Sequence, residues 1–191
     1  NTPVSSANMS RSETWPVPYV SKLQGGGIQP GQTLIVRGVC IGQRFDINLS
    51  TTPDLSGTVP FHMSVRLDEK AFVHNTKTDE EWGKEERKKC SFKTEEPFDI
   101  RIRAHDDRFE IIVDQKELGA YEYRKPLITI SHLVVNGEIS LHAVNWGGKY
   151  YPVPYQAGMD GGFHPGKRLY VSGNLEEKGK SFSINLLNNA G

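Results

Sequence analysis

Residues 97–114 read PFDIRIRAHDDRFEIIVD, and this stretch decides the fold class. Apolar and polar side chains alternate for seven residues from Pro97 to Arg103. This is the period of a β-strand with one buried side and one solvent-facing side. The polar residues 105–108 then separate this run from a second apolar run at residues 109–114. The stretch therefore predicts two successive strands and no helix.

The same pattern recurs along most of the chain. Strand-like runs occupy residues 33–39, 44–49, 133–135 and 139–144. The last two flank Asn136-Gly137. This dipeptide predicts a type I′ hairpin, because both central residues of a type I′ turn need positive φ. Residues 78–89 have a single large apolar side chain in twelve residues, too few to pack a helix. Short strands without intervening helices predict an all-β, antiparallel sandwich or barrel.

The composition excludes several classes of partner. Lys plus Arg and Asp plus Glu both number 23, so the formal net charge is zero and no field draws the chain to nucleic acid or anionic lipid. No apolar run approaches the roughly 18 residues that cross a bilayer, so we expect no membrane insertion. Cys40 and Cys90 are too far apart for a zinc motif, and free thiols are favoured over a single disulfide.

An internal repeat determines the expected domains. Several landmarks recur at a nearly constant shift of 135 to 137 residues: PVPY at 16–19 and 152–155, Pro-Gly at 30–31 and 165–166, and FDINL at 45–49 against FSINL at 182–186. We therefore predict a mobile arm at 1–14, a complete domain at 15–148, a linker at 149–154, and the truncated first strands of a second copy at 155–191.

Polar side chains gather between residues 61 and 87. His62, Ser64 and Arg66 are spaced by two, so in a strand they share one face while Met63 and Val65 point into the core. An ordinary solvent face is the alternative interpretation of these three residues. The partner segment favours a binding site, because it supplies further hydrogen-bonding groups and an aromatic plane at Asn75, Trp82, Glu85 and Arg87.

These residues resemble the carbohydrate-recognition motif of the galectins, the β-galactoside-binding lectins. The family pattern is His-x-Asn-x-Arg, then an Asn, then Trp-Gly-x-Glu-x-Arg, and the resemblance covers residues 15–146. It implies a galectin-like jelly roll, a two-sheet β-sandwich. It also implies these roles: His62 and Arg66 bind the axial 4-hydroxyl of galactose, Asn75 and Glu85 bind the 6-hydroxyl, Trp82 stacks on the sugar, and Glu85 and Arg87 reach the second sugar.

One position departs from the family pattern, because Ser64 stands where Asn is usual. Serine is shorter and lacks the paired donors and acceptor of an amide, so one sugar contact is expected to be lost or replaced by water. A galectin-like scaffold that acts through protein contacts is therefore the alternative function. The repeat resembles the tandem-repeat galectins described from nematodes.

The resemblance implies a non-enzymatic lectin for lactose and N-acetyllactosamine ends of glycans, without cofactor or metal. A glycosidase would need two carboxylates across the cleaved bond, whereas Glu85 and Glu86 point to opposite faces of a strand. The family also implies a cytoplasmic and extracellular location without a visible signal peptide. Chain-chain association is expected through the second repeat. The sequon Asn48-Leu49-Ser50 falls in a predicted strand, so we do not expect glycosylation there.

Overall fold

The structure is a computed structural model that describes residues 14–23, 27–78, 81–147, 153–156, 158–159, 162–167, 169, 171 and 179–187. The chain divides into two compact units, residues 1–150 and residues 151–191. In the described part of the first unit the regular structure consists of strands and one 3₁₀ turn. No helix in the described residues is long and apolar enough to span a bilayer.

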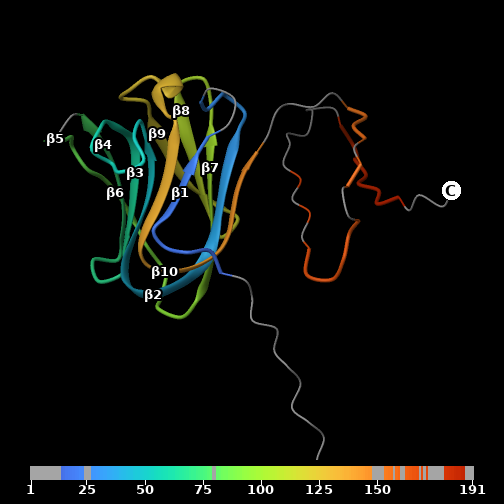
Figure 1. The fold of residues 1–191 in the computed structure, drawn as a ribbon, viewed down its shortest axis with the longest axis horizontal. Helices are drawn as coiled ribbons and strands as arrows, with labels where there is room; N and C mark the ends of the chain where they lie inside the picture. Colours follow the sequence, from blue (N-terminus) through green and yellow to red (C-terminus); the bar gives the residue numbers. More distant parts are fainter. Residues whose placement is uncertain are drawn as a thin grey trace, which may run out of the picture. The chain divides into compact units, whose positions relative to one another are not determined.

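The strands follow one another in the order shown in Figure 1. They are β1 (Tyr19–Lys22), β2 (Thr33–Ser50), β3 (Val59–Arg66), β4 (Ala71–Thr78), β5 (Glu81–Trp82), β6 (Glu86–Lys89), β7 (Pro97–Ala104), β8 (Arg108–Val113), β9 (Lys116–Glu122) and β10 (His132–Gly147). The 3₁₀ turn η1 (Leu127–Thr129) precedes β10. All the pairings between these strands are antiparallel.

Two sheets arise because the long strands β2 and β10 belong to both. Residues 33–39 of β2 pair with β7, whereas residues 44–49 pair with β3. Strand β10 pairs with both halves of β2. The first sheet therefore runs β1, β10, β2, β3, β4 and the pair β5 and β6, and the second runs β10, β2, β7, β8 and β9 (Figure 1). The predicted all-β, two-sheet sandwich is confirmed.

The hairpin predicted at Asn136-Gly137 is wrong. Strand β10 continues through both residues, and each pairs with β2, Asn136 opposite Asp46 and Gly137 opposite Phe45. A register shift follows Gly137, whose φ of +106° is used for a bulge instead of a turn. Only glycine fits there, because a Cβ would lie 2.6 Å from the Phe45 Cα. The two flanking runs form one strand because β2 runs unbroken beside both.

The core between the sheets explains which faces remain for a site. Large apolar side chains from both sheets meet there, among them Phe61, Phe109 and Tyr121, with the rings of Phe61 and Phe109 4.8 Å apart. On β3, Met63 and Val65 are fully buried in this core. Because side chains alternate along a strand, the residues between them face away from the core. Both cysteines are free, as predicted, and both are buried.

The terminal predictions lie largely outside the described residues. Residues 1–13 of the expected arm and much of 148–191 are not described. In the second unit, none of the described residues between 153 and 187 lies in a strand. The apolar side chains of Phe182, Ile184 and Leu186 are exposed there. A second copy of the domain therefore stays a prediction.

Candidate functional site

The register of the first sheet brings the predicted residues of β3 and β4 onto one outer face. His62 pairs with Asn48 of β2 on one side and with Asn75 of β4 on the other. Residues directly opposite each other in an antiparallel pair share a face. Ser64 and Arg66 follow on the same face because they lie two and four residues further along β3. These side chains form one polar row across three strands.

Trp82 provides an aromatic plane at the end of this row. It lies on the short strand β5, opposite Lys77 of β4. Its ring centroid is 4.6 Å from that of His62, at an interplanar angle of 55°. Half of the Trp82 surface is exposed, whereas His62 is buried. A large apolar plane therefore faces solvent directly beside hydrogen-bonding groups.

The hydrogen bonds of Asn48 determine the tautomer of His62. The Asn48 amide nitrogen donates to the backbone oxygen of Val134 and to Oδ1 of Asn136, at 3.3 and 3.2 Å. The Asn48 Oδ1 therefore faces His62 Nδ1, 2.6 Å away. Because an amide oxygen only accepts, Nδ1 carries the proton and Nε2 keeps its lone pair. His62 thus offers an acceptor to a ligand.

Four charged side chains form a closed ring of ion pairs beside the row. Arg66 donates to Glu69 and to Glu85, both at 3.2 Å. Arg87 donates to Glu85 at 2.7 Å and also pairs with Glu69. Each carboxylate therefore bridges the same two guanidinium groups. This arrangement holds the charged groups in place without a ligand.

The ring also keeps both carboxylates ionised. Hydrogen bonds from Arg87, together with the nearby charge of Arg66, lower the pKa of Glu69 and of Glu85. An ionised carboxylate accepts hydrogen bonds and cannot supply a proton. Glu85 is therefore suited to accept hydrogen bonds from hydroxyl groups and unsuited to general-acid chemistry.

Ser64 lies fully buried beneath Arg66. Its hydroxyl oxygen accepts a hydrogen bond from Arg66 Nε at 3.3 Å. Ser64 pairs with Asp46 of β2 and with Val73 of β4 in the sheet register. Ser64 therefore contacts Arg66, another predicted site residue, and helps to orient the Arg66 guanidinium.

All seven predicted residues lie on this part of the first sheet, and Asn48 and Glu69 are among the neighbours that sequence reasoning missed. The predicted set is His62, Ser64, Arg66, Asn75, Trp82, Glu85 and Arg87. Asn48 was interpreted only as part of a sequon, but its buried amide bonds to His62. Glu69 lies in the β3–β4 turn and closes the ion-pair ring. The cross-strand register of β2 with β3 is the signal that identifies Asn48.

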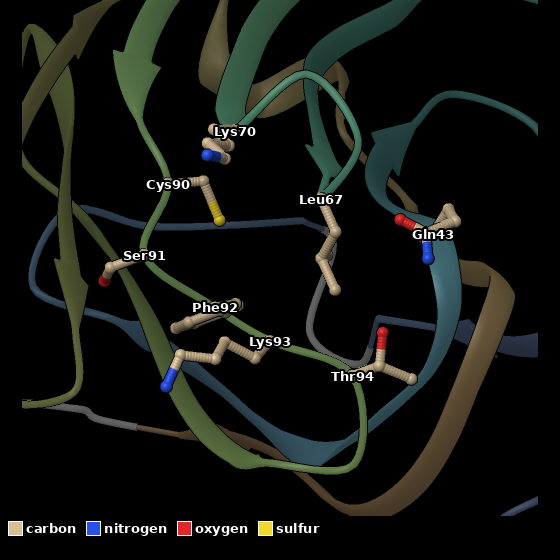
Figure 2. A pocket seen from close by; sticks show the side chains of 8 residues that line it. All are labelled: Gln43, Leu67, Lys70, Cys90, Ser91, Phe92, Lys93 and Thr94. Atoms are coloured by element: carbon tan, nitrogen blue, oxygen red, sulfur yellow. The ribbon is translucent and has the colours of Figure 1, made fainter.

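A separate cavity of about 440 Å³ lies near the β3–β4 turn. Figure 2 shows Leu67 and Cys90 directed into it, with Phe92 and Lys93 at its wall. None of the seven predicted residues lines this cavity. Burial raises the pKa of the Cys90 thiol, which therefore stays protonated at neutral pH. The described residues contain no cluster of three or more side chains suited to a metal.

Two buried histidines predict how stability depends on pH. Burial lowers the pKa of His62 and of His74 to about 4, against about 6.5 when unfolded. Between these values the unfolded chain binds more protons, so unfolding becomes easier as pH falls. We expect the free energy of unfolding to be constant near pH 7 to 8 and to fall by a few kcal/mol between pH 6.5 and 4. Urea titrations at each pH measure this.

A substitution separates these histidines from the carboxylates that titrate at lower pH. His74 packs against Phe61 and Tyr121, and its Nε2 has no hydrogen-bond partner among the described residues. His74→Leu should therefore reduce the slope of the free energy of unfolding against pH between pH 6.5 and 4. The matched control is His142→Gln, at a half-buried residue bonded to Ser140. An unchanged slope in His74→Leu contradicts the assignment.

Comparisons with known proteins show which family the chain is similar to. The family described as galactoside-binding lectin matches residues 18–146. A "32 kDa beta-galactoside-binding lectin" of Haemonchus contortus is 56% identical over 180 residues, covering 92% of this chain and 63% of the relative. The lectin of the same name from Caenorhabditis elegans is 55% identical over 183 residues, covering 94% and 65%. The chain thus spans less than two thirds of either relative.

Solved structures support the fold assignment independently. Sheep galectin-11 in complex with glycerol aligns with a TM-score of 0.63 at 21% identity, covering 70% of this chain and 99% of that one. A double variant of human galectin-16 aligns with a TM-score of 0.66 at 23% identity, covering 71% and 99%. The family match includes every strand from β1 to β9 and all of β10 except Gly147. The chain belongs to the galactoside-binding lectin family, the galectins.

Proposed function

We propose that the first unit binds β-galactosides, such as the lactose and N-acetyllactosamine ends of glycans, on the outer face of its first sheet. The observation that carries this proposal is the half-exposed Trp82 ring beside His62 and the ion-pair ring. A flat apolar plane next to fixed donors and acceptors fits a ligand with one C–H face and several hydroxyl groups. The names of the two nematode relatives support the same ligand class.

The proposed contacts follow the chemistry of each group. The 4-hydroxyl donates to His62 Nε2 and accepts from Arg66, the two roles that their protonation states allow. Asn75 and Glu85 bind the 6-hydroxyl. Trp82 covers the C–H face, and Glu85 and Arg87 extend to the second sugar.

Discrimination against glucose follows from this arrangement. An equatorial 4-hydroxyl would leave His62 and Arg66 without their shared partner. Each unpaired polar group costs roughly 1–3 kcal/mol when it is shielded from water. This cost applies to His62, because it is shielded from water and only 6% exposed.

The charged groups of the site support ligand binding without a catalysed reaction. A retaining or inverting glycosidase needs a carboxylic acid that keeps its proton near neutral pH. Glu69 and Glu85 have lowered pKa values because both bind Arg87. We therefore propose a lectin and not a hydrolase.

Replacing Trp82 by alanine tests the site. Because the Trp82 side chain is half exposed and lies outside the core cluster, we expect Trp82→Ala to leave the fold intact and to abolish measurable lactose binding. Isothermal titration calorimetry measures the affinity, and thermal unfolding checks the fold. The matched control is Trp15→Ala, at a similarly exposed indole that contacts Tyr19. Affinity within threefold of the parent in Trp82→Ala would refute the site.

Ser64 supports a second candidate, a galectin-like scaffold with weakened sugar binding that acts through protein contacts. Its hydroxyl already serves Arg66, and the amide usual in the family is absent. Restoring an amide tests this candidate. If Ser64 weakens the site, Ser64→Asn should strengthen lactose binding by about one neutral hydrogen bond, ~0.5–1.5 kcal/mol. Unchanged or weaker binding means that the Arg66–Ser64 contact already compensates.

We propose further that residues 155–191 belong to a second galectin copy, the tandem-repeat arrangement. Matching turns support the repeat. Gln32 N donates to Gln29 O at 3.1 Å, and Lys167 N donates to His164 O at 3.0 Å. Both turns contain Pro-Gly, with φ of +92° at Gly31 and +91° at Gly166. Each is a type II turn, at the same shift of 135 residues.

The exposed apolar residues of this segment support association between chains. Phe182, Ile184 and Leu186 are at least half exposed, whereas their counterparts in β2 are buried. Exposed apolar strand-like segments pair readily with other strands. We expect light scattering after size exclusion to give a dimer for this chain and a monomer for a version that ends at Gly148. A dimer in both cases, or a monomer in both, contradicts this proposal.

A further inference from the structure

Arg124 connects the end of one sheet to the candidate site in the other. It follows β9, yet its guanidinium donates to the backbone oxygen of Lys84 at 2.8 Å and to Glu86 at 2.8 Å. It also donates to Oδ1 of Asn75 at 3.2 Å and lies 4.9 Å from the Tyr121 ring centroid. Sequence reasoning did not identify Arg124. One side chain thus contacts both β4 and the β5–β6 connection.

The backbone of Gly83 packs closely against this guanidinium. A Cβ at Gly83 would lie 3.0 Å from Arg124 Nη1 and 3.2 Å from Asn75 Oδ1. The Gly83 amide donates to the backbone oxygen of Thr76 at 2.9 Å. Trp82 precedes this glycine and Glu85 follows two residues later. Arg124 therefore holds the connection that carries both side chains.

The same contacts determine which way the Asn75 amide faces. Its Oδ1 accepts from the Thr76 amide at 2.8 Å and from Arg124, so both lone pairs are used. Its Nδ2 donates one hydrogen to the backbone oxygen of Gly83 at 2.9 Å. The second hydrogen of Nδ2 has no partner in the described part of the chain. Asn75 therefore has one donor and no acceptor left for a ligand.

We propose that Arg124 is a positioning residue that keeps the Asn75 amide as a hydrogen-bond donor, so that the site selects a hydroxyl at the galactose 6-position. This inference rests on the proposed galactoside function. A hydroxyl fits because it accepts from Asn75 and donates to the ionised Glu85 at once. Without Arg124, one lone pair of Oδ1 loses its partner, and the amide can turn its oxygen toward the ligand. The site then no longer determines that Asn75 donates to the 6-hydroxyl while Glu85 accepts from it.

A comparison of two ligands on two proteins isolates this effect from a general loss of structure. Lactose and 6′-deoxylactose differ only in the galactose 6-hydroxyl. On the wild-type chain we expect 6′-deoxylactose to bind about tenfold more weakly, the equivalent of one to two neutral hydrogen bonds. On Arg124→Ala we expect this ratio to fall to about twofold. Calorimetry with each ligand gives both ratios.

Two further variants keep the test decisive. Arg124→Met retains an unbranched stem over Tyr121 but has no donors, so the same loss of the ratio is expected even if Arg124→Ala unfolds. Arg108→Ala is the matched control, since Arg108 bonds to Asp107 at 2.7 Å and, among the described residues, to nothing in the β5–β6 connection. Its ratio should stay at the wild-type value.

The outcomes distinguish this inference from the proposed function. A wild-type chain that does not bind lactose overturns the proposed function. A wild-type chain that binds lactose, with an unchanged ratio in Arg124→Met, overturns the role of Arg124 alone. Equal weakening of both ligands also overturns it, because a merely structural role lowers both affinities and preserves their ratio.

Discussion

Strands β2 and β10 pair from Ser50 opposite His132 to Thr33 opposite Gly147, and the other strands attach to this pair directly or through one or two intervening strands. The pair passes from one sheet into the other, so both sheets inherit its bend. The carboxylate of Glu138 stabilises this bend, because it accepts hydrogen bonds from the backbone amides of Gln43 and Arg44 at 2.6 and 3.2 Å. The position of β3, and hence of the candidate site, follows from the half of β2 that comes after the bend.

The candidate site combines a rigid part with a part on the edge of the sheet. Asn48 and His62 lie on central strands and bond to each other, and Asn48 also donates to β10, so the sheet itself orients them. Trp82 lies in the short edge strand β5, and Glu85 lies in the connection between β5 and β6. Few backbone hydrogen bonds between strands are available there. Side-chain bonds from Arg66, Arg87 and Arg124 replace that missing support.

Strand alternation was sufficient to predict the fold class and the face that His62, Ser64 and Arg66 share, because both depend on local spacing. The hairpin at Asn136-Gly137 could not be excluded from sequence, since a turn and a bulge use the same positive φ at glycine. Glu69, Asn48 and Arg124 were missed for another reason. These residues have partners that lie 14 to 49 residues away, and the folded arrangement of the two sheets brings them together.

The closed ring of Arg66, Glu69, Arg87 and Glu85 has a consequence for the entropy of binding. Long charged side chains in solution sample many rotamers, and immobilising one on association typically costs about 0.5–1.5 kcal/mol. Here each guanidinium already has two carboxylate partners. Their rotamers are ordered during folding, so a sugar meets groups that have little conformational freedom left to lose.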